Sequence, residues 1–354
     1  IGKNLINIIE NDKKKFEIVL LTANKDYKSL LKQAKKFKVK NLIITNNNSF
    51  KFLKKKINNQ EIKIYNDFKS FNKIFKTRID YTMSSISGLE GLVPTLNIIK
   101  YTKKIAIANK ESIICGWNLI SRKLKSSKTQ FIPVDSEHFS IWYGLHKNNN
   151  SIEKIYLTAS GGPFKSLPLN KFTNISIEQA LKHPNWKMGK KISIDSATMM
   201  NKVFEIIEAK KIFNINYKNL NILIHPKSYV HAIIKFKNGL IKLVAHDTDM
   251  RIPIYNSLFL SNQTSMKKFL SKNINIKKLN NLNFEKINYK RFPSIKILNN
   301  LPESNSLFET ILVAANDELV KIFLQKKIKF TEIAKKLLLF LRKSEFKKYK
   351  KKSP

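Results

Sequence analysis

The first third of the chain alternates between short apolar runs and segments whose apolar residues recur with helical spacing. Residues 16–22 and 41–45 have the length and composition of strands, and residues 27–37 between them have the pattern of a helix. A helix that connects two strands in this way returns the chain to the same end of the sheet, so the strands run parallel. The alternation therefore predicts βαβ units and a parallel sheet, in a protein of the α/β class.

Polar residues follow directly after a later predicted strand, at residues 104–108. Asn109, Lys110 and Glu111 stand there, at the start of a segment with helical spacing. Open α/β sheets bind ligands at the carboxyl ends of their strands, which makes these three side chains candidates for ligand contacts. Asn109 is equally suited to cap the helix that follows, so a purely structural turn is the alternative.

A second polar group follows the apolar run at residues 130–134. Asp135, Ser136 and Glu137 place two carboxylates one residue apart at the end of a predicted strand. Two carboxylates that converge can bind a hard cation such as Mg²⁺ or Mn²⁺, which prefers oxygen ligands. Such a pair is more often ordinary loop polarity, so the pair alone does not establish a metal site.

Residues 183–208 are rich in polar side chains of several kinds. The segment begins with His183, contains Gly189 and continues with helical spacing, for which Asp195 or Ser196 is the expected N-cap. Backbone N–H groups and the helix dipole favour an anion at such an end, so the segment predicts a phosphate site. The alternative is an ordinary capped amphipathic helix.

Asn201 and Glu205 lie one helical turn apart in the same segment and should share a helix face, with Lys202 one position round. A carboxylate at this place could hold a metal close to a ligand bound at the start of the helix. The polar face of a solvated helix would show the same residues, so both interpretations remain open.

The rest of the chain indicates more strands and helices but fewer chemical signals. A strand ends at Ser160, where the small residues that follow let a ligand approach the backbone. Asn238 and Gly239 indicate a hairpin turn between two strands. A long helix is expected at residues 306–325.

The chain has a formal net charge of +42, with lysines spread over its whole length. Together with abundant Ile and Asn, this indicates a general compositional drift, and no zinc-finger spacing or Arg-rich tract points to specific nucleic-acid binding. The single cysteine, Cys115, excludes an internal disulfide and is typical of a reducing compartment. No apolar run is long enough to span a bilayer, and no signal-peptide pattern is present, so a cytoplasmic protein without membrane contact is expected.

Six stretches resemble, in the same order, signature segments of the 1-deoxy-D-xylulose 5-phosphate reductoisomerase family. They are GLEGLVPT at residues 88–95, ANKES at 108–112, VDSEH at 134–138, TASGGPF at 158–164, the segment at 183–208 and HPKSYVH at 225–231. Each stretch alone is a weak signal, but the ordered set is specific. The resemblance covers nearly the whole chain.

The resemblance implies a fold and an activity. The family converts 1-deoxy-D-xylulose 5-phosphate to 2-C-methyl-D-erythritol 4-phosphate with NADPH and a divalent metal, Mg²⁺ or Mn²⁺, in isoprenoid precursor biosynthesis. A homodimer is expected. The expected parts are a Rossmann-like NADPH-binding domain at residues 1–134, an α+β catalytic domain at 135–262, a linker at 263–290 and a small C-terminal helical domain at 291–354.

By the same resemblance, Asp135, Glu137 and Glu205 would hold the metal, Lys110 would orient the substrate, and Trp186 would close over it as part of a lid. The expected substrate contacts are Lys110, Ser136, Glu137, Ser160, His183, Trp186, Ser196, Asn201, Lys202 and Glu205. The expected cofactor contacts are Ile1, Asn24, Lys25, Asp26, Asn109, Glu111 and Gly189.

In the family, the pyrophosphate of NADPH lies on a Gly-rich loop, of which only the last two residues, Ile1 and Gly2, are present here. Residues 1–354 alone are therefore expected to bind NADPH weakly, because the backbone N–H groups of that loop would be missing. Lys25 keeps a positive charge for the 2′-phosphate, whereas Asn24 and Asp26 replace a usual Gly and Asn. The chain is also expected to stop short of the family's usual C-terminal end.

Three alternatives remain open from the sequence. Another NADP-dependent dehydrogenase acting on a phosphorylated sugar would show similar sheet and cofactor signals. A basic nucleic-acid-binding protein would explain the charge and would lose affinity steeply as salt rises. A decayed, inactive relative would explain the expected losses at both ends.

Overall fold

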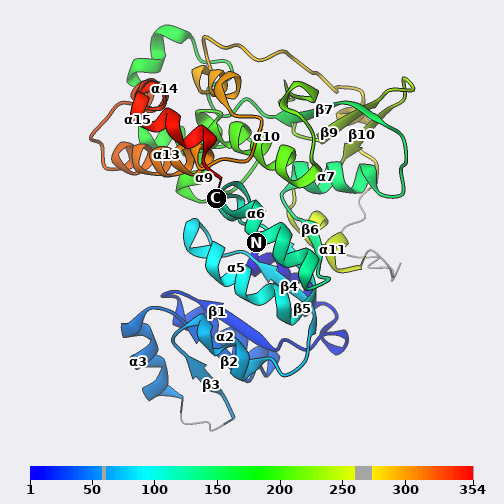
Figure 1. Ribbon diagram of the computed structural model, residues 1–354, viewed down its shortest axis with the longest axis vertical. Helices are drawn as coiled ribbons and strands as arrows, with labels where there is room; N and C mark the ends of the chain where they lie inside the picture. Colours follow the sequence, from blue (N-terminus) through cyan, green and yellow to red (C-terminus); the bar gives the residue numbers. More distant parts are fainter. Residues whose placement is uncertain (58–60, 260–272, 354) are drawn as a thin grey trace.

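The computed structural model describes residues 1–57, 61–259 and 273–353 (Figure 1). The lower part of the molecule in this view contains a parallel sheet with the strand order β1-β2-β3. Its elements are α1 (Gly2–Glu10), β1 (Leu20–Ala23), α2 (Tyr27–Phe37), β2 (Asn41–Ile44), α3 (Asn47–Lys56), β3 (Lys63–Tyr65) and α4 (Phe71–Ile74). The predicted βαβ alternation is confirmed, although β1 starts at Leu20 instead of residue 16. Phe16 packs its ring edge-on against Phe259, with 5.7 Å between the ring centroids.

A second parallel sheet, with the order β4-β5-β6, lies in the middle of the view. Its elements are β4 (Ile79–Ser84), α5 (Leu92–Ile98), β5 (Thr102–Ile107), α6 (Lys110–Ser126) and β6 (Gln130–Pro133). Among the described residues, β1 and β4 share no ladder, so the six parallel strands form two sheets instead of one. Ile107 of β5 and Ile113 of α6 pack in one hydrophobic cluster, which holds the start of α6 at the carboxyl end of β5.

The third sheet is mixed, has the order β10-β9-β7-β8 and lies in the upper part of the view. Its elements and the helix before it are α7 (Ser136–Leu145), β7 (Ile152–Ala159), β8 (Leu220–Ile224), β9 (Val230–Phe236) and β10 (Ile241–Ala245). β7 runs parallel to β8 and antiparallel to β9. The hairpin between β9 and β10 is confirmed, and Gly239 supplies its left-handed residue with a φ of 87°.

Two consecutive helices, α9 (Lys190–Ala197) and α10 (Met200–Phe213), cross the upper part of the molecule. The prediction that Asp195 or Ser196 caps the start of the helix is wrong, because both residues lie inside α9. The helical path breaks at Met199, whose φ of 63° is left-handed, and α10 begins after it without a side-chain cap. Met199 and Met200 are buried in the hydrophobic core, so packing and not capping determines where α10 begins.

The C-terminal residues pack against α10. The remaining helices are α8 (Ile177–Ala180), α11 (Arg251–Phe259), α12 (Ile276–Leu279), α13 (Phe308–Leu324), α14 (Phe330–Arg342) and α15 (Ser344–Lys347). α13 corresponds to the helix predicted at residues 306–325, and its Phe308 shares a hydrophobic cluster with Phe204 of α10. Across the described ranges, no helix has both the length and the apolarity that crossing a membrane requires.

The predicted linker at residues 263–290 is only partly visible, because residues 263–272 lie outside the described ranges. In its visible part, Glu285 exchanges backbone hydrogen bonds with Ile224 at the end of β8. This part of the chain is therefore attached to the mixed sheet. The boundaries predicted for the domains remain a prediction.

Candidate active site

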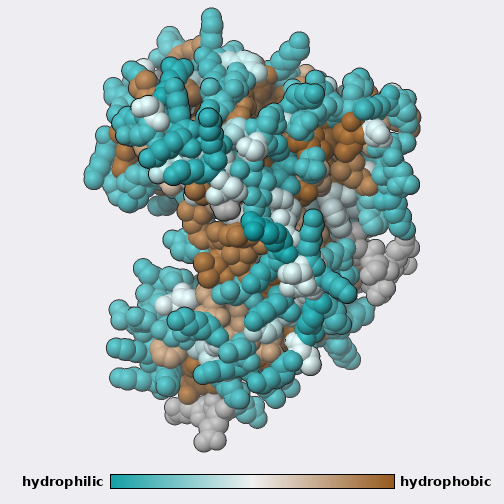
Figure 2. Space-filling view, in the orientation of Figure 1, coloured by the Kyte–Doolittle hydropathy of each residue, from teal (hydrophilic) through white to brown (hydrophobic). Residues whose placement is uncertain are grey.

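A cavity of about 700 Å³ lies where the carboxyl ends of β4, β5, β6 and β7 meet α9, α10 and the segment before α9. Figure 2 shows that the molecule is hollowed at one side between its upper and lower parts. Most of the predicted site residues line the cavity: Ile1, Asn109, Lys110, Glu111, Asp135, Ser136, Glu137, Ser160, His183, Trp186, Gly189, Ser196, Asn201, Lys202 and Glu205. Asn24, Lys25 and Asp26 do not.

Three carboxylates converge in this cavity. Asp135 and Glu137 come from the start of α7, directly after β6, and Glu205 comes from the second turn of α10. Each offers an oxygen that lies within 4.8 Å of the oxygens of the other two. Glu205 is only 1% exposed, so its charge depends on neighbouring groups for compensation.

Two ammonium groups lie among these carboxylates. Lys110 Nζ lies 3.0 Å from Asp135 Oδ2 and 3.4 Å from Glu205 Oε1. Lys202 Nζ donates to Glu137 Oε1 at 2.8 Å and also contacts Glu205. Burial alone would lower the pKa of each lysine, but the adjacent carboxylates outweigh it and raise both pKa values. Both lysines are therefore charged at neutral pH.

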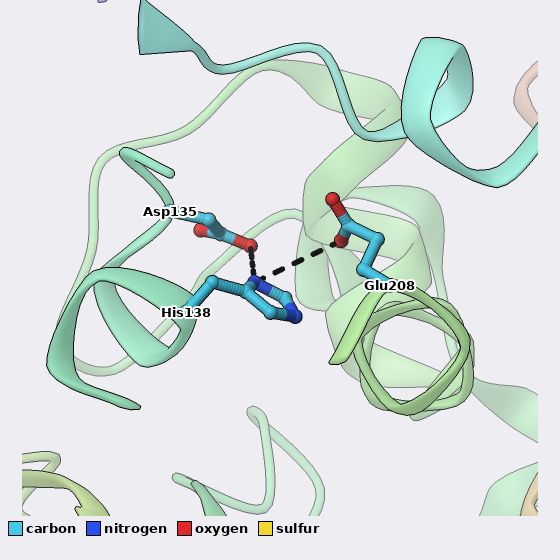
Figure 3. A group of neighbouring side chains, drawn as sticks. All are labelled: Asp135, His138 and Glu208. Atoms are coloured by element: carbon cyan, nitrogen blue, oxygen red, sulfur yellow. Dashed lines mark ion pairs between the residues drawn. The ribbon is translucent and has the colours of Figure 1, made fainter. Parts of the chain in front are cut away.

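A buried histidine that is not among the predicted site residues lies behind Asp135. Figure 3 shows His138 Nδ1 directed at the carboxylates of Asp135 and Glu208, at 3.6 and 4.0 Å. The other ring nitrogen, Nε2, lies 2.9 Å from the backbone carbonyl oxygen of Glu205. Burial would lower the pKa of His138, but Glu208 and Asp135 raise it to about 9. Both ring nitrogens are therefore donors at neutral pH, which suits the three acceptors around them.

Glu208 is also missing from the predicted site residues. It lies three positions after Glu205 on α10, and this spacing places two side chains on one face of a helix. This spacing could have identified Glu208 as a neighbour of Glu205 from the sequence alone. The burial of Glu208, which is 2% exposed and has its pKa raised by burial to about 7, depends on tertiary packing and left no such signal.

The charges of this group fit a divalent cation. Four carboxylates, those of the three converging residues and of Glu208, face the two ammonium groups of Lys110 and Lys202. When all four carboxylates are ionised, negative charge remains in excess even with His138 protonated. Burial and the neighbouring Glu137 raise the pKa of Glu205, as expected for like charges held close together. Three carboxylates without a sulfur ligand suit Mg²⁺ or Mn²⁺ better than zinc.

His183 is held in one tautomer by its neighbours. Its Nδ1 accepts hydrogen bonds from the backbone N–H groups of Asn185, at 3.2 Å, and Trp186, at 3.0 Å. Nε2 therefore carries the ring proton and donates it to Ser160 Oγ at 3.2 Å. Burial lowers the pKa of His183 to about 4, so the ring is neutral at neutral pH.

Trp186 lies in the irregular segment before α9 and is half-buried. Its ring meets His231 edge-on, with 6.2 Å between the ring centroids. In the part of the chain that the structure describes, none of the buried hydrophobic clusters includes Trp186. This surrounding is compatible with a lid, which stays a prediction.

The residues predicted to bind a phosphate lie on two helices, and the phosphate site stays a prediction. Ser196 lies in the last turn of α9, whereas Asn201 and Lys202 lie in the first turn of α10. The uncapped start of α10 is thus the helix end that lies beside these side chains. Gly162 packs against the backbone of Ser196, where an added Cβ would lie 3.0 Å from the carbonyl oxygen.

The predicted cofactor residues fall into two groups. The side chain of Asn109 accepts a hydrogen bond from the N–H of Ser112 and so caps α6. This is the structural role that was the alternative to a ligand contact. Glu111 lies in the first turn of α6, and Gly189 precedes α9 with open space beside its Cα. These three residues line the cavity.

The second group follows β1 and has structural contacts of its own. Asn24 donates from Nδ2 to Thr45 Oγ1 at 2.8 Å, and the carbonyl oxygen of Lys25 accepts from Ser49. Asp26 caps α2, which gives this carboxylate a structural role. A cofactor contact at these residues stays a prediction.

The sequence matches three family models that together cover most of the chain. Residues 1–116 match the model described as 1-deoxy-D-xylulose 5-phosphate reductoisomerase, residues 131–213 its C-terminal domain, and residues 246–353 the model described as DXP reductoisomerase C-terminal domain. A 1-deoxy-D-xylulose 5-phosphate reductoisomerase of Pelagibacter ubique is 63% identical, over 100% of this chain and 91% of the relative. The chain belongs to this family.

More distant relatives agree. The reductoisomerase of Wolbachia pipientis wMel is 38% identical over 94% of this chain and 85% of its own length. The structure of the Zymomonas mobilis enzyme in complex with NADPH has a TM-score of 0.87 and 32% identity, and covers 100% of this chain and 90% of that one. A reductoisomerase in complex with NADPH, fosmidomycin and magnesium has the same TM-score at 27% identity, and covers 99% of this chain and 88% of that one. The predictions of family, fold class and enzyme activity are confirmed.

Proposed function

We propose that the cavity is the active site in which this protein rearranges and reduces 1-deoxy-D-xylulose 5-phosphate to 2-C-methyl-D-erythritol 4-phosphate. The observation that carries the proposal is the convergence of Asp135, Glu137 and Glu205 beside two charged lysines. These three carboxylates would hold Mg²⁺ or Mn²⁺, which, when bound, supplies Lewis-acid stabilisation of negative charge on the substrate's oxygens. Lys110, already held between Asp135 and Glu205, would orient the substrate.

The phosphate end of the substrate would lie against the start of α10. Ser196, Asn201 and Lys202 surround that end, and Ser160 with the neutral His183 offers hydroxyl and ring hydrogen bonds nearby. Ser136 lies beside Glu137 and bonds its carboxylate at 2.6 Å, which would leave Glu137 oriented toward the centre of the site. Trp186 would cover the bound substrate and exclude water.

NADPH would approach from the side of the parallel sheets. Asn109, Glu111, Gly189 and Ile1 line that side of the cavity and are the proposed contacts. The residues after β1, at positions 24–26, would meet the 2′-phosphate only if the cofactor extends along the carboxyl ends of the strands. The proposed NADPH-binding, catalytic and C-terminal domains keep the predicted boundaries at residues 134, 262 and 290.

A spectrophotometric assay of NADPH oxidation tests this function. The full-length protein should oxidise NADPH when both 1-deoxy-D-xylulose 5-phosphate and Mg²⁺ or Mn²⁺ are added, and a chelator should abolish the reaction. Activity with a different phosphorylated sugar instead would favour another dehydrogenase. No metal-dependent oxidation, together with RNA binding that falls steeply with salt, would favour the nucleic-acid-binding alternative.

Two copies of the chain would pair through β10. This strand ends the mixed sheet, and the apolar side chains of its Ile241 and Leu243 and of Leu240 directly before it are 57%, 45% and 60% exposed. Figure 2 shows apolar side chains gathered in the same region of the molecule. Exposed apolar edge strands tend to pair with another chain. Sedimentation should therefore show a dimer that Leu243→Lys dissociates, whereas Leu339→Lys on α14 should not.

The proposed setting is the cytosol. The single cysteine, Cys115, is buried in the core, and burial raises the pKa of its thiol to about 12. Such a thiol is unreactive and requires no oxidising compartment. Fractionation of cells that express the protein would test this location.

A further inference from the structure

One ammonium group outside the metal cluster joins three parts of the chain at the wall of the cavity. Lys191 of α9 has its Nζ 2.8 Å from Glu111 Oε1, 3.0 Å from Asp195 Oδ2 and 3.1 Å from Asp317 Oδ1. Glu111 belongs to α6, Asp195 to α9 and Asp317 to α13. The side chain of Lys191 remains 32% exposed toward the cavity that all four residues line.

The ammonium group is surrounded by carboxylates, of which Glu111 accepts a hydrogen bond from it. A lysine carries three N–H donors, and here they face three carboxylates, one on each helix. A phosphate approaching Lys191 would also meet these three negative charges. The three ion pairs therefore indicate that Lys191 holds the carboxylates in place.

A second contact fixes this arrangement from the side of α13. Asn316, which is fully buried, donates from Nδ2 to Asp195 Oδ1 at 2.8 Å. Asp195 is thereby bound at both oxygens, by Lys191 and by Asn316. Among the residues that the structure describes, Glu111 bonds no side chain other than Lys191, so its position depends on this ion pair.

We propose that Lys191 is a positioning residue that holds the carboxylate of Glu111 at the cofactor side of the cavity and links it to α9 and α13. This inference rests on the proposed function, in which Glu111 contacts NADPH. Without Lys191, the carboxylates of Glu111, Asp195 and Asp317 would repel one another, and Glu111 would turn away because it would lose this partner. Cofactor binding would weaken while the metal cluster stays intact.

NADPH titration followed by fluorescence tests the proposal on the natural protein, including any residues that precede Ile1. Lys191→Met should raise the NADPH dissociation constant about tenfold, the size expected for one charge-assisted contact. The kcat at saturating NADPH should stay within about threefold of the unaltered protein, since the reacting groups are not touched. In a Glu111→Gln background, Lys191→Met should have almost no further effect, because the two residues act through one contact.

Two further variants keep the test decisive. Lys191→Gln retains an N–H donor and should fold even if Lys191→Met does not, with a smaller rise in the dissociation constant. Lys321→Met on α13 removes an exposed ion pair with Glu318 and should leave NADPH binding unchanged.

Equal NADPH affinity in the Lys191 variants and the unaltered protein would overturn the role of Lys191 alone. Additive effects of the Lys191 and Glu111 substitutions would overturn it as well. No NADPH binding by the unaltered protein would overturn the proposed function on which the inference rests.

Discussion

Replacing Lys202 by methionine would test whether one ammonium group serves both the carboxylates and the substrate phosphate. Lys202 is 4% exposed and donates to Glu137 Oε1 at 2.8 Å. Methionine has a similar length and helix propensity, so the change removes the charge and keeps most of the packing. The lost charge-assisted contact is worth about 1.5–3 kcal/mol, which raises the substrate KM roughly 10- to 150-fold. The KM for NADPH should stay unchanged, because Lys202 lies on the side of the cavity that is proposed for the phosphate.

The same variant should also destabilise the protein when metal is absent. Glu137 and Glu205 would then lie buried and close together after losing a cationic partner, which costs about 3–5 kcal/mol of unfolding free energy. Mg²⁺ at about 100 times its dissociation constant would return about 2.7 kcal/mol, because it binds the folded state. Urea unfolding followed by tryptophan fluorescence, with Mg²⁺ and with a chelator, measures both effects.

Lys210→Met is the matched control on the same helix. Lys210 pairs at 3.3 Å with Glu303, whose side chain is 64% exposed, and exposed pairs contribute at most about 1 kcal/mol. A raised KM for NADPH with an unchanged substrate KM in Lys202→Met would refute the phosphate role. Equal stability of the two variants in chelator would refute the reasoning about uncompensated carboxylates.

Three other substitutions test separate parts of the site. Trp186→Ala should lower turnover and leave the thermal midpoint nearly unchanged, whereas calorimetry showing a loss of about 3–5 kcal/mol would place the ring in the core. Asp135→Asn should weaken Mn²⁺ binding about 100-fold or more in a calorimetric titration, and an unchanged affinity would remove Asp135 from the metal site. The pKa of Glu208 is raised by burial from 4.5 to about 7, so the folded protein keeps this proton longer than the unfolded chain and loses stability as pH rises between these values. Glu208→Gln should remove that loss in urea midpoints measured across this pH range, and an unchanged slope would contradict the assignment.

The alternation of strands and helices was predictable because each element carries its own period of apolar residues. α2 matches the predicted helix at both ends, and the later strands differ from prediction mainly at their ends. The start of β1 differs because the apolar residues before Leu20 also serve contacts outside the sheet, such as that of Phe16 with Phe259. A local pattern shows that a residue is apolar, but it does not show which surface buries it.

The break between α9 and α10 was not predictable for a related reason. Asp195 and Ser196 are good N-cap residues, and the sequence rules favour a helix that starts at one of them. In the structure, Asp195 is buried and is bound by Lys191 and Asn316, so its carboxylate is used in a tertiary contact. Met199 takes the left-handed conformation although it has none of the usual preference for it, because packing of the core fixes its position.

Local sequence patterns were equally unable to predict how the charges in the candidate active site are balanced. Sequence spacing and resemblance identified Asp135, Glu137 and Glu205 as a set, but they did not indicate how the set is balanced. The balance comes from three cationic groups that the fold brings together: Lys110 from the start of α6, Lys202 from α10, and His138 behind Asp135. A carboxylate with 1% exposure, such as Glu205, would be too costly to bury without these partners, so the folded protein must hold cations around it even before a metal binds. The lysines predicted as substrate contacts are therefore also part of what allows these carboxylates to be buried, and this second role follows only from the three-dimensional arrangement.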